Sequence, residues 1–287
     1  MIKEFAVEPA AIVESALRFQ YVIEKFGISE GRVISEFPAK WKKLVYEAAQ
    51  QEHHGKTELT KILEKIKHLP KNALISLARP AGTGDWLDIV KAEHQRQPFD
   101  WVLTKSPEEI GQAVHLDAWD AGHPSLQNQR QERIARTAEE MARVCRPLLR
   151  VAKHVKLVDP HFDLNNLRYR EPLARFIECL PENACIDIFV AGLMLDGTRD
   201  HLLNGANRFL PQRLHRGMQV KLWGHAKGRM HNRYVLSQLG GLFFGVGLDM
   251  AVGDATPMDE VTLLEERIRV ELWSEYADGE LIGTWRG

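Results

Sequence analysis

The feature that most constrains the fold of this chain is a regular alternation of strand-type and helix-type segments in its C-terminal half. Short runs rich in Val, Ile, Leu and Phe are separated by longer segments whose apolar residues recur at helical spacing. The order strand, helix, strand, helix, strand, followed by a hairpin, indicates a mixed sheet with helices on its faces. The expected strands cover residues 155–158, 186–191, 220–223, 231–237, 242–246 and 268–273, and the expected helices cover residues 172–180 and 201–215.

The first part of the chain has a different pattern, with more helix than strand. Helical spacing is expected over residues 8–26, 41–50, 59–66 and 85–94, and strands over residues 72–78 and 99–103. Gly and Pro cluster in the loop 118–125, after which a long helix is expected to about residue 151. We therefore expect a mostly helical α+β domain over residues 1–124 and an α/β domain over residues 125–287.

Composition is typical of a globular chain that does not enter a membrane. Its 287 residues are 44% apolar and 27% charged, with a formal net charge of −1. Its three cysteines, Cys145, Cys179 and Cys185, lie in apolar segments without a C-x-x-C spacing, which favours reduced thiols. The N-terminal residues lack the pattern of a signal peptide, and no apolar run has the length of a membrane span. These features predict a cytoplasmic protein.

Positive charge is concentrated in residues 199–233, although the whole chain is nearly neutral. Eight basic residues there face one acid, Asp200, so the segment carries 8 − 1 = +7. Such a concentration is typical of a site for an anion; a helix face in solvent, neutralised by the acidic C-terminal residues, is the alternative. The basic residues are Arg199, Arg208, Arg213, Arg216, Lys221, Lys227, Arg229 and Arg233.

The sharpest motif is the segment 230–250, MHNRYVLSQLGGLFFGVGLDM. A His-x-Arg triplet opens an expected strand, a Gly-Gly turn follows, and the segment closes on Gly-Val-Gly-Leu-Asp. The triplet is weak by itself, because the chain has five His-x-(Lys/Arg) triplets. Only the one at His231 and Arg233 lies on a strand that leads through a glycine turn into that ending, so its context makes it informative.

This segment resembles the active-site strand and hairpin of the phospholipase D superfamily, where a His-x-Lys-x4-Asp motif opens a strand. It is more similar to the phospholipase D-like domain found C-terminal to MIT domains, which has a His-Asp-Arg start and a Gly-x-Gly-Leu-Asp close. The run VKLVDPHFD at residues 155–163 resembles the strand that begins such domains. The resemblance covers residues 125–287 and implies a single phospholipase D-like repeat. The matching residues are His231, Arg233, Gly240, Gly241, Gly245, Gly247, Leu248 and Asp249.

The resemblance implies a metal-independent phosphodiesterase, with a nuclease as the favoured form and a nucleic acid as the favoured substrate. Residues i and i+2 of a strand point to one face, so His231 could attack phosphorus while Arg233 holds two phosphate oxygens. A second histidine must protonate the leaving oxygen, and one repeat per chain implies a homodimer that supplies it. Asp249 would orient the imidazole. No cofactor is expected, and His225, Lys227 and Arg229 are the expected additional phosphate ligands.

Two departures from the superfamily motif leave the function open. Arg233 stands where the motif has Lys, and Gln238 stands where it has Asp. The alternatives are a non-catalytic module that binds the phosphates of nucleic acid or acidic lipid headgroups, and a scaffold subunit of a larger complex. In the first alternative, residues 1–115 could dock a protein partner; in the second, the basic segment would contact an acidic protein.

A second polar cluster follows the first strand of this domain. Asp159, His161 and Asp163 alternate where that strand ends, a place where open α/β sheets bind ligands. Carboxylates and imidazole could bind a divalent metal there. We favour the other interpretation, in which the aspartates cap the turn, and expect no metal site.

Overall fold

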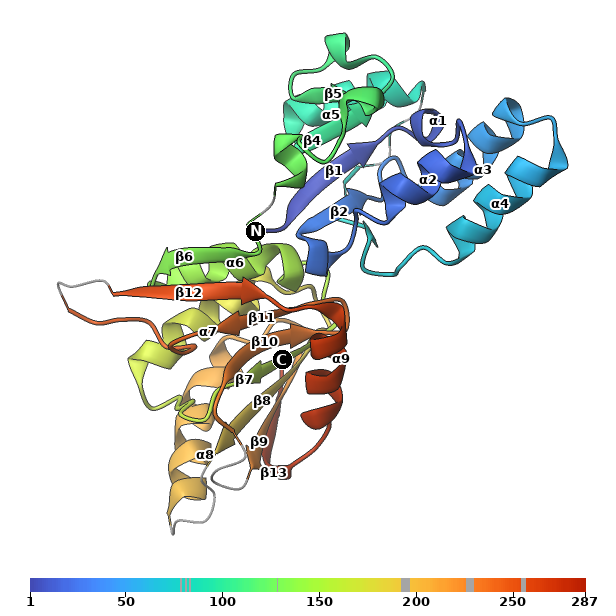
Figure 1. Ribbon diagram of the computed structural model, residues 1–287. Helices are drawn as coiled ribbons and strands as arrows, with labels where there is room; N and C mark the ends of the chain where they lie inside the picture. Colours follow the sequence, from blue (N-terminus) through green and yellow to red (C-terminus); the bar gives the residue numbers. More distant parts are fainter. Residues whose placement is uncertain are drawn as a thin grey trace. The chain divides into compact units, whose positions relative to one another are not determined.

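The computed structural model describes all residues except Ala78, Ala81, Thr83, Asn128 and residues 192–196, 226–229 and 254–256. The chain divides into two compact units (Figure 1). Ile2–Gln129 form one unit, and Arg130–Gly287, with Met1, form the other. The division falls a few residues after the loop 118–125.

The first unit contains a parallel sheet, in the order β3-β2-β1-β4-β5 among its described residues. Helices cover both faces, because separate apolar cores form on the two sides, one around Phe5 and Trp41 and one around Val90 and Phe99. The strands are β1 (Lys3–Val7), β2 (Arg32–Ser35), β3 (Leu74–Ile75), β4 (Trp101–Thr104) and β5 (Ala113–His115). The helices are α1 (Pro9–Ile12), α2 (Ala16–Ile23), α3 (Trp41–Glu52), α4 (Lys56–Lys67) and α5 (Trp86–Arg96).

This architecture corrects the expectation of a mostly helical α+β domain. The unit is an α/β layer structure, and the sequence pattern missed β1, β2 and β5. Each of these strands has five residues or fewer, which is too short to show a period clearly. Parallel strands buried on both faces also lack the alternation that marks a half-exposed strand.

The second unit contains a mixed sheet in the order β13-β9-β8-β7-β10-β11-β12-β6 among its described residues. The central strands β7, β8 and β9 are parallel, and the flanking strands are antiparallel to their neighbours. The strands are β6 (Gln131–Ala135), β7 (His154–Val158), β8 (Cys185–Ala191), β9 (Gln219–His225), β10 (Arg233–Ser237), β11 (Gly241–Phe244), β12 (Met258–Leu263) and β13 (Glu280–Arg286).

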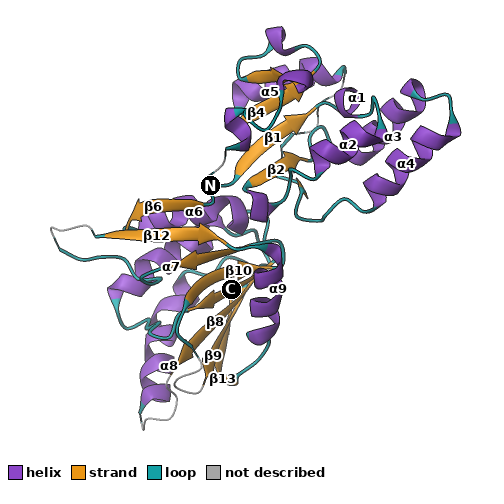
Figure 2. Cartoon of the chain, viewed as in Figure 1, coloured by secondary structure: helices purple, strands orange, loops and turns teal. Residues whose placement is uncertain are grey.

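Helices α6, α7 and α8 lie on one face of this sheet and α9 lies on the other (Figure 2). The face under α9 carries an apolar and aromatic cluster that includes Val158, Phe189 and Tyr276. The helices are α6 (Ala138–Leu149), α7 (Leu167–Cys179), α8 (Thr198–Phe209) and α9 (Glu266–Glu275). The mixed α/β sheet with flanking helices is therefore confirmed. Among the described residues, no helix combines the length and apolar character needed to cross a bilayer.

Two expectations for this unit were wrong. The expected helix from residue 126 to 151 is a strand, β6, followed by α6, which begins after Thr137 accepts a hydrogen bond from the Glu140 N–H. The expected strand 268–273 is part of helix α9, and the last strand is β13. Alternation of apolar and polar residues over 268–273 also fits helical spacing, because Ile268 and Leu272 are four residues apart.

Candidate functional site

The ends of β7 and β10 bring an aspartate beside the arginine of the His-x-Arg triplet. The strands are antiparallel and Tyr234 pairs with Val158, so Arg233 and Asp159 lie at the same level and on the same face. Arg233 is half-buried and Asp159 is only 1% exposed. The arginine acts to lower the pKa of the Asp159 carboxyl. The positive charge of Arg233 thus favours the ionised form of Asp159, with no hydrogen bond or ion pair between the two among the described residues.

Backbone N–H groups hold the Asp159 carboxylate in place. Its Oδ2 accepts a hydrogen bond from the Leu248 N–H at 2.8 Å, and its Oδ1 accepts one from the His161 N–H at 2.9 Å. Burial raises the pKa of Asp159, although these two N–H groups and Arg233 oppose the rise. A buried carboxylate held by two backbone hydrogen bonds has a fixed position at the end of β7.

The Gly-Val-Gly-Leu-Asp segment after β11 closes over this carboxylate. A Cβ atom at Gly247 would lie 2.5 Å from Oδ1 of Asp249 and 3.4 Å from Oδ2 of Asp159. Leu248 is fully buried while its N–H donates to Asp159. The glycine therefore permits the two carboxylates to approach the same backbone, which explains the motif in structural terms.

Asp249 is bound by two arginines. Its Oδ1 and its backbone carbonyl accept hydrogen bonds from Nη2 of Arg136 at 2.5 and 2.8 Å, and its Oδ2 forms an ion pair with Nη2 of Arg168. Burial raises the pKa of nearby Tyr169, and the charges of Asp159 and Asp249 raise it further. Both oxygens of Asp249 are engaged, so the structure places this residue with Arg136 and Arg168, where it stabilises the loop.

His231 lies just before β10, which begins at Arg233. The side chain of His231 is exposed, and Nη1 of Arg233 donates a hydrogen bond to the His231 carbonyl at 2.9 Å. The Nε atom of Arg233 is buried and has no hydrogen-bond partner among the described residues. The imidazole therefore stands at the surface, two residues before Arg233. The strand expected from residue 231 begins only at Arg233, so strand alternation does not by itself place the two side chains on one face.

The structure does not bring His225, one of the other expected phosphate ligands, to this place. His225 ends β9 on the face that carries Phe189 and Tyr276, which it contacts at ring centroid distances of 5.5 and 5.8 Å. The register places Arg233 on the opposite face. Lys227 and Arg229 lie outside the described residues.

Gln238 and Asp163 are two further polar residues that the sequence singles out. Gln238 follows β10 at the end remote from Arg233, about 16 Å along a strand of this length. Asp163 pairs with His201 at 3.0 Å and accepts hydrogen bonds from Asn165, and these contacts outweigh burial and lower the pKa of Asp163. Within the described residues, no group of three or more His, Cys, Asp or Glu side chains could hold a metal ion.

The sequence pattern missed three residues of this cluster. Arg136 fell inside the expected long helix, and Arg168 and Tyr169 had no expected role. The turn-capping role expected for Asp159 is confirmed, because its Oδ1 accepts a hydrogen bond from the His161 N–H, but its hydrogen bond with Leu248 was not expected. The one available signal was the Asp-Pro that ends β7, since polar residues at the carboxyl ends of such strands often serve a site.

Comparisons with known proteins leave the family open. No family model matches the chain, and no curated protein matches it. Among solved structures, TrmBL2, an archaeal chromatin protein with a novel mode of DNA binding, aligns at 13% identity and a TM-score of 0.28, over 84% of this chain and 81% of that one. A polyphosphate kinase from Porphyromonas gingivalis aligns at 12% identity and a TM-score of 0.29, over 82% of this chain and 43% of that one. Similarities this weak decide neither fold family nor function.

Proposed function

We propose that this protein is a metal-independent phosphodiesterase, and specifically a nuclease, with His231 as the nucleophile. The observation that carries the proposal is the exposed His231 two residues before Arg233, with the buried Asp159 opposite Arg233 in the strand register. A nucleophile and a cation at one strand end are the two groups that phosphodiester cleavage without a metal requires.

The reaction would run in two displacements. An imidazole nitrogen of His231 attacks phosphorus, the phosphorus–nitrogen bond forms, and the bond to the leaving oxygen breaks. Water then attacks the phosphorus, and the phosphorus–nitrogen bond breaks. Arg233 would hold the phosphate oxygens as their charge grows, through the donors that its contact with the His231 carbonyl leaves open.

A second histidine is needed to protonate the leaving oxygen. We propose that a homodimer provides it, with His231 of a second copy across a twofold axis. Nucleic acid is the favoured substrate, because the segment 199–233 carries an excess of seven positive charges in a chain of net charge −1. We place this activity in the cytoplasm, where the three free cysteines would stay reduced.

The test is cleavage of single-stranded and double-stranded DNA, RNA and bis(p-nitrophenyl) phosphate in the presence of a chelator. The wild-type protein should cleave at least one of these, and His231→Ala should lower the rate by about 10³-fold or more. His54→Ala, another exposed histidine, is the matched control and should keep the full rate. A folded, dimeric wild-type protein that cleaves none of them would refute the proposal.

The second candidate is a phosphate-binding module without turnover. It is favoured by one observation, the engagement of Asp249 by Arg136 and Arg168, which leaves that carboxylate no free oxygen to orient an imidazole. This module would bind an oligonucleotide with an affinity that falls steeply as salt rises. Arg233→Ala would weaken that binding, whereas an affinity independent of salt would exclude this candidate.

A further inference from the structure

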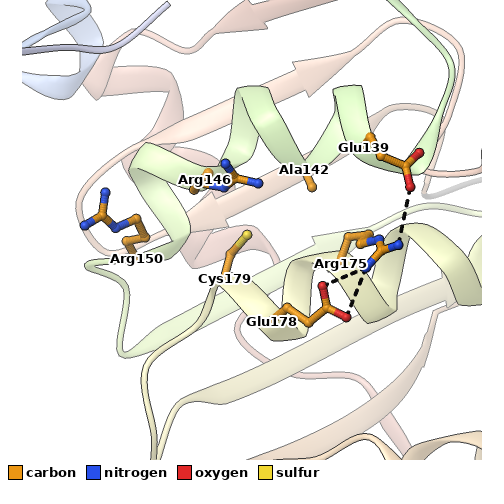
Figure 3. Close-up of a pocket in the computed structure, with 7 residues that line it drawn as sticks. All are labelled: Glu139, Ala142, Arg146, Arg150, Arg175, Glu178 and Cys179. Carbon is orange, nitrogen blue, oxygen red and sulfur yellow. Dashed lines mark hydrogen bonds and ion pairs between the residues drawn. The ribbon is translucent and has the colours of Figure 1, made fainter. Parts of the chain in front are cut away.

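A groove between α6 and α7 is lined by arginines that the candidate site does not use. Its volume is about 650 Å³, large enough for a ligand bigger than a single water molecule. Figure 3 shows Arg146 and Arg150 on α6 and the turn that follows it, with Arg175 and Cys179 on α7. On each segment the two residues are four apart, so both point along the same side of their helix.

The charges of this groove are only partly compensated. Arg175 pairs with Glu178 at 3.0 Å and with Glu139 at 3.5 Å. In contrast, Arg146 and Arg150, in the last turn and at the C-terminal cap of α6, have no acidic partner among the described residues. Arg146 and Arg150 thus leave uncompensated positive charge along one side of the groove, which favours the binding of an anion.

Arg143 on the same helix provides an internal comparison. It is also exposed, but it pairs with Glu140 and with Glu132. These contacts raise its pKa. On this helix, Arg143 is therefore paired with acidic residues, whereas Arg146 and Arg150, which line the groove, have no acidic partner among the described residues.

We propose that this groove binds the phosphate group of a ligand through Arg146 and Arg150, with Arg175 as a third donor. Guanidinium groups match the geometry of phosphate oxygens because each presents parallel N–H donors. The site is separate from the one at His231. Arg136 and Arg150 flank the two ends of α6, and the helical rise places them about 20 Å apart. The inference does not depend on any catalytic activity.

The test is calorimetric titration of the full chain with inorganic phosphate and with a single-stranded oligonucleotide, at constant ionic strength. The double variant R146A/R150A should bind the phosphate-bearing probe at least 10-fold more weakly than wild type. R143A removes an arginine from the same helix and should bind within about twofold of wild type. Binding of inorganic phosphate would identify a small anion as the ligand; binding of the oligonucleotide alone would identify a nucleic-acid strand.

A second readout uses Cys179, which lines the groove and is half-exposed. The bound probe should slow alkylation of Cys179 by neutral iodoacetamide and leave Cys185, which lies outside the groove, unchanged. Protection should disappear in R146Q and R150Q, single variants that alter the fold less than the double one. Equal affinity in R146A/R150A and R143A, or a lower melting temperature without any change in binding, would overturn the proposal and assign the arginines to stabilising the helix ends.

Discussion

Asp159 connects the candidate site to the stability of the second unit. Its carboxylate is buried at the end of β7, accepts two backbone N–H groups and faces Arg233. Burial removes water from the ionised carboxylate and so destabilises its charged form. The two hydrogen bonds and the charge of Arg233 offset part of this destabilisation. The residue therefore titrates differently in the folded and unfolded chains, which makes its contribution measurable.

Acidification should stabilise the wild type relative to Asp159→Asn. Burial raises the folded-state pKa of Asp159 above its ordinary value of 3.8, so the folded state binds the proton more tightly than the unfolded state. The contribution of Asp159 to stability is therefore largest below pH 3.8 and falls as pH rises from 3.8 through the raised value. Melting temperatures of both proteins from pH 3.5 to 7 would show this. A difference that grows as pH rises would contradict the assignment.

Gly247 should not tolerate even a methyl group. A Cβ there would lie 2.5 Å from the Asp249 carboxylate, so Gly247→Ala must displace Asp249 or the loop. We expect a loss of about 1–3 kcal/mol in the free energy of unfolding, measured by urea denaturation. Gly111→Ala, where nothing lies within 4 Å of the added atom, should change it by less than about 1 kcal/mol. Equal stabilities of the two variants would refute the proposed close packing.

At the scale of elements, the central strands of the second sheet were predicted from the sequence, whereas β6, β12 and β13 at its two ends were not. Residues 186–191 were identified because a parallel strand buried on both faces is a nearly continuous apolar run, whereas residues 155–158 and 220–223 were identified from apolar residues that flank one lysine in each. In contrast, β6 (QERIA) and β12 (MDEVTL) each carry two consecutive charged residues, Glu132 and Arg133 in β6 and Asp259 and Glu260 in β12. Those residues fit a helix surface equally well, so the local pattern could not exclude a helix.

The candidate site was predictable in part for a related reason. His231, Arg233 and Asp249 share one short segment, so their motif is visible in the sequence. The placement of Arg233 opposite Asp159 depends on β10 pairing with β7, and the contacts of Asp249 with Arg136 and Arg168 depend on three distant segments. Only the order of strands brings them together, and no local pattern contains that order.

A buried lysine of the sheet holds the C-terminal end of helix α9, in addition to the apolar packing between them. Nζ of Lys156 donates to the carbonyls of Trp273 and Tyr276 at 2.8 and 2.6 Å, at the C-terminal end of the helix. It also lies 4.2 Å from the centroid of the Trp273 ring. Carbonyls in the last turn of a helix have no N–H partner within it. Lys156, on strand β7, therefore caps the C-terminal end of α9.

Lys156→Met should therefore destabilise the protein. The side chain is of similar length but leaves the two carbonyls without their donor. We expect a loss of about 1.5–3 kcal/mol, measured by denaturant unfolding with far-UV circular dichroism. Lys153→Met, at an exposed position on the preceding turn, is the control and should cost less than about 0.5 kcal/mol. A Lys156 variant as stable as the control would show that the cap does not hold α9.

At the scale of the whole molecule, the proposed chemistry requires two copies of the chain. Each chain has one His-x-Arg triplet in the required context, and the reaction uses two histidines. A shared site in a twofold dimer is the simplest arrangement, because it places the same residue on both sides of the phosphate.

Mixing experiments would detect a shared site. When wild type and His231→Ala are denatured together in equal amounts and refolded, about one quarter of the dimers contain two intact copies. Activity should fall to about one quarter of the wild-type value per dimer, with the size of the dimer checked by light scattering. Retention of about one half would show that each chain acts alone.

The most direct measurement is detection of the covalent intermediate on His231. Wild-type protein is incubated with bis(p-nitrophenyl) phosphate in chelator, quenched in alkali and analysed by peptide mass spectrometry, with His231→Asn alongside. We predict a nitrophenyl-phosphoryl group on the peptide that contains His231, formed with release of one nitrophenolate and absent from the variant. Hydrolysis of the substrate with His231 unmodified, or at an unchanged rate in His231→Asn, would contradict the assignment of this residue as the nucleophile.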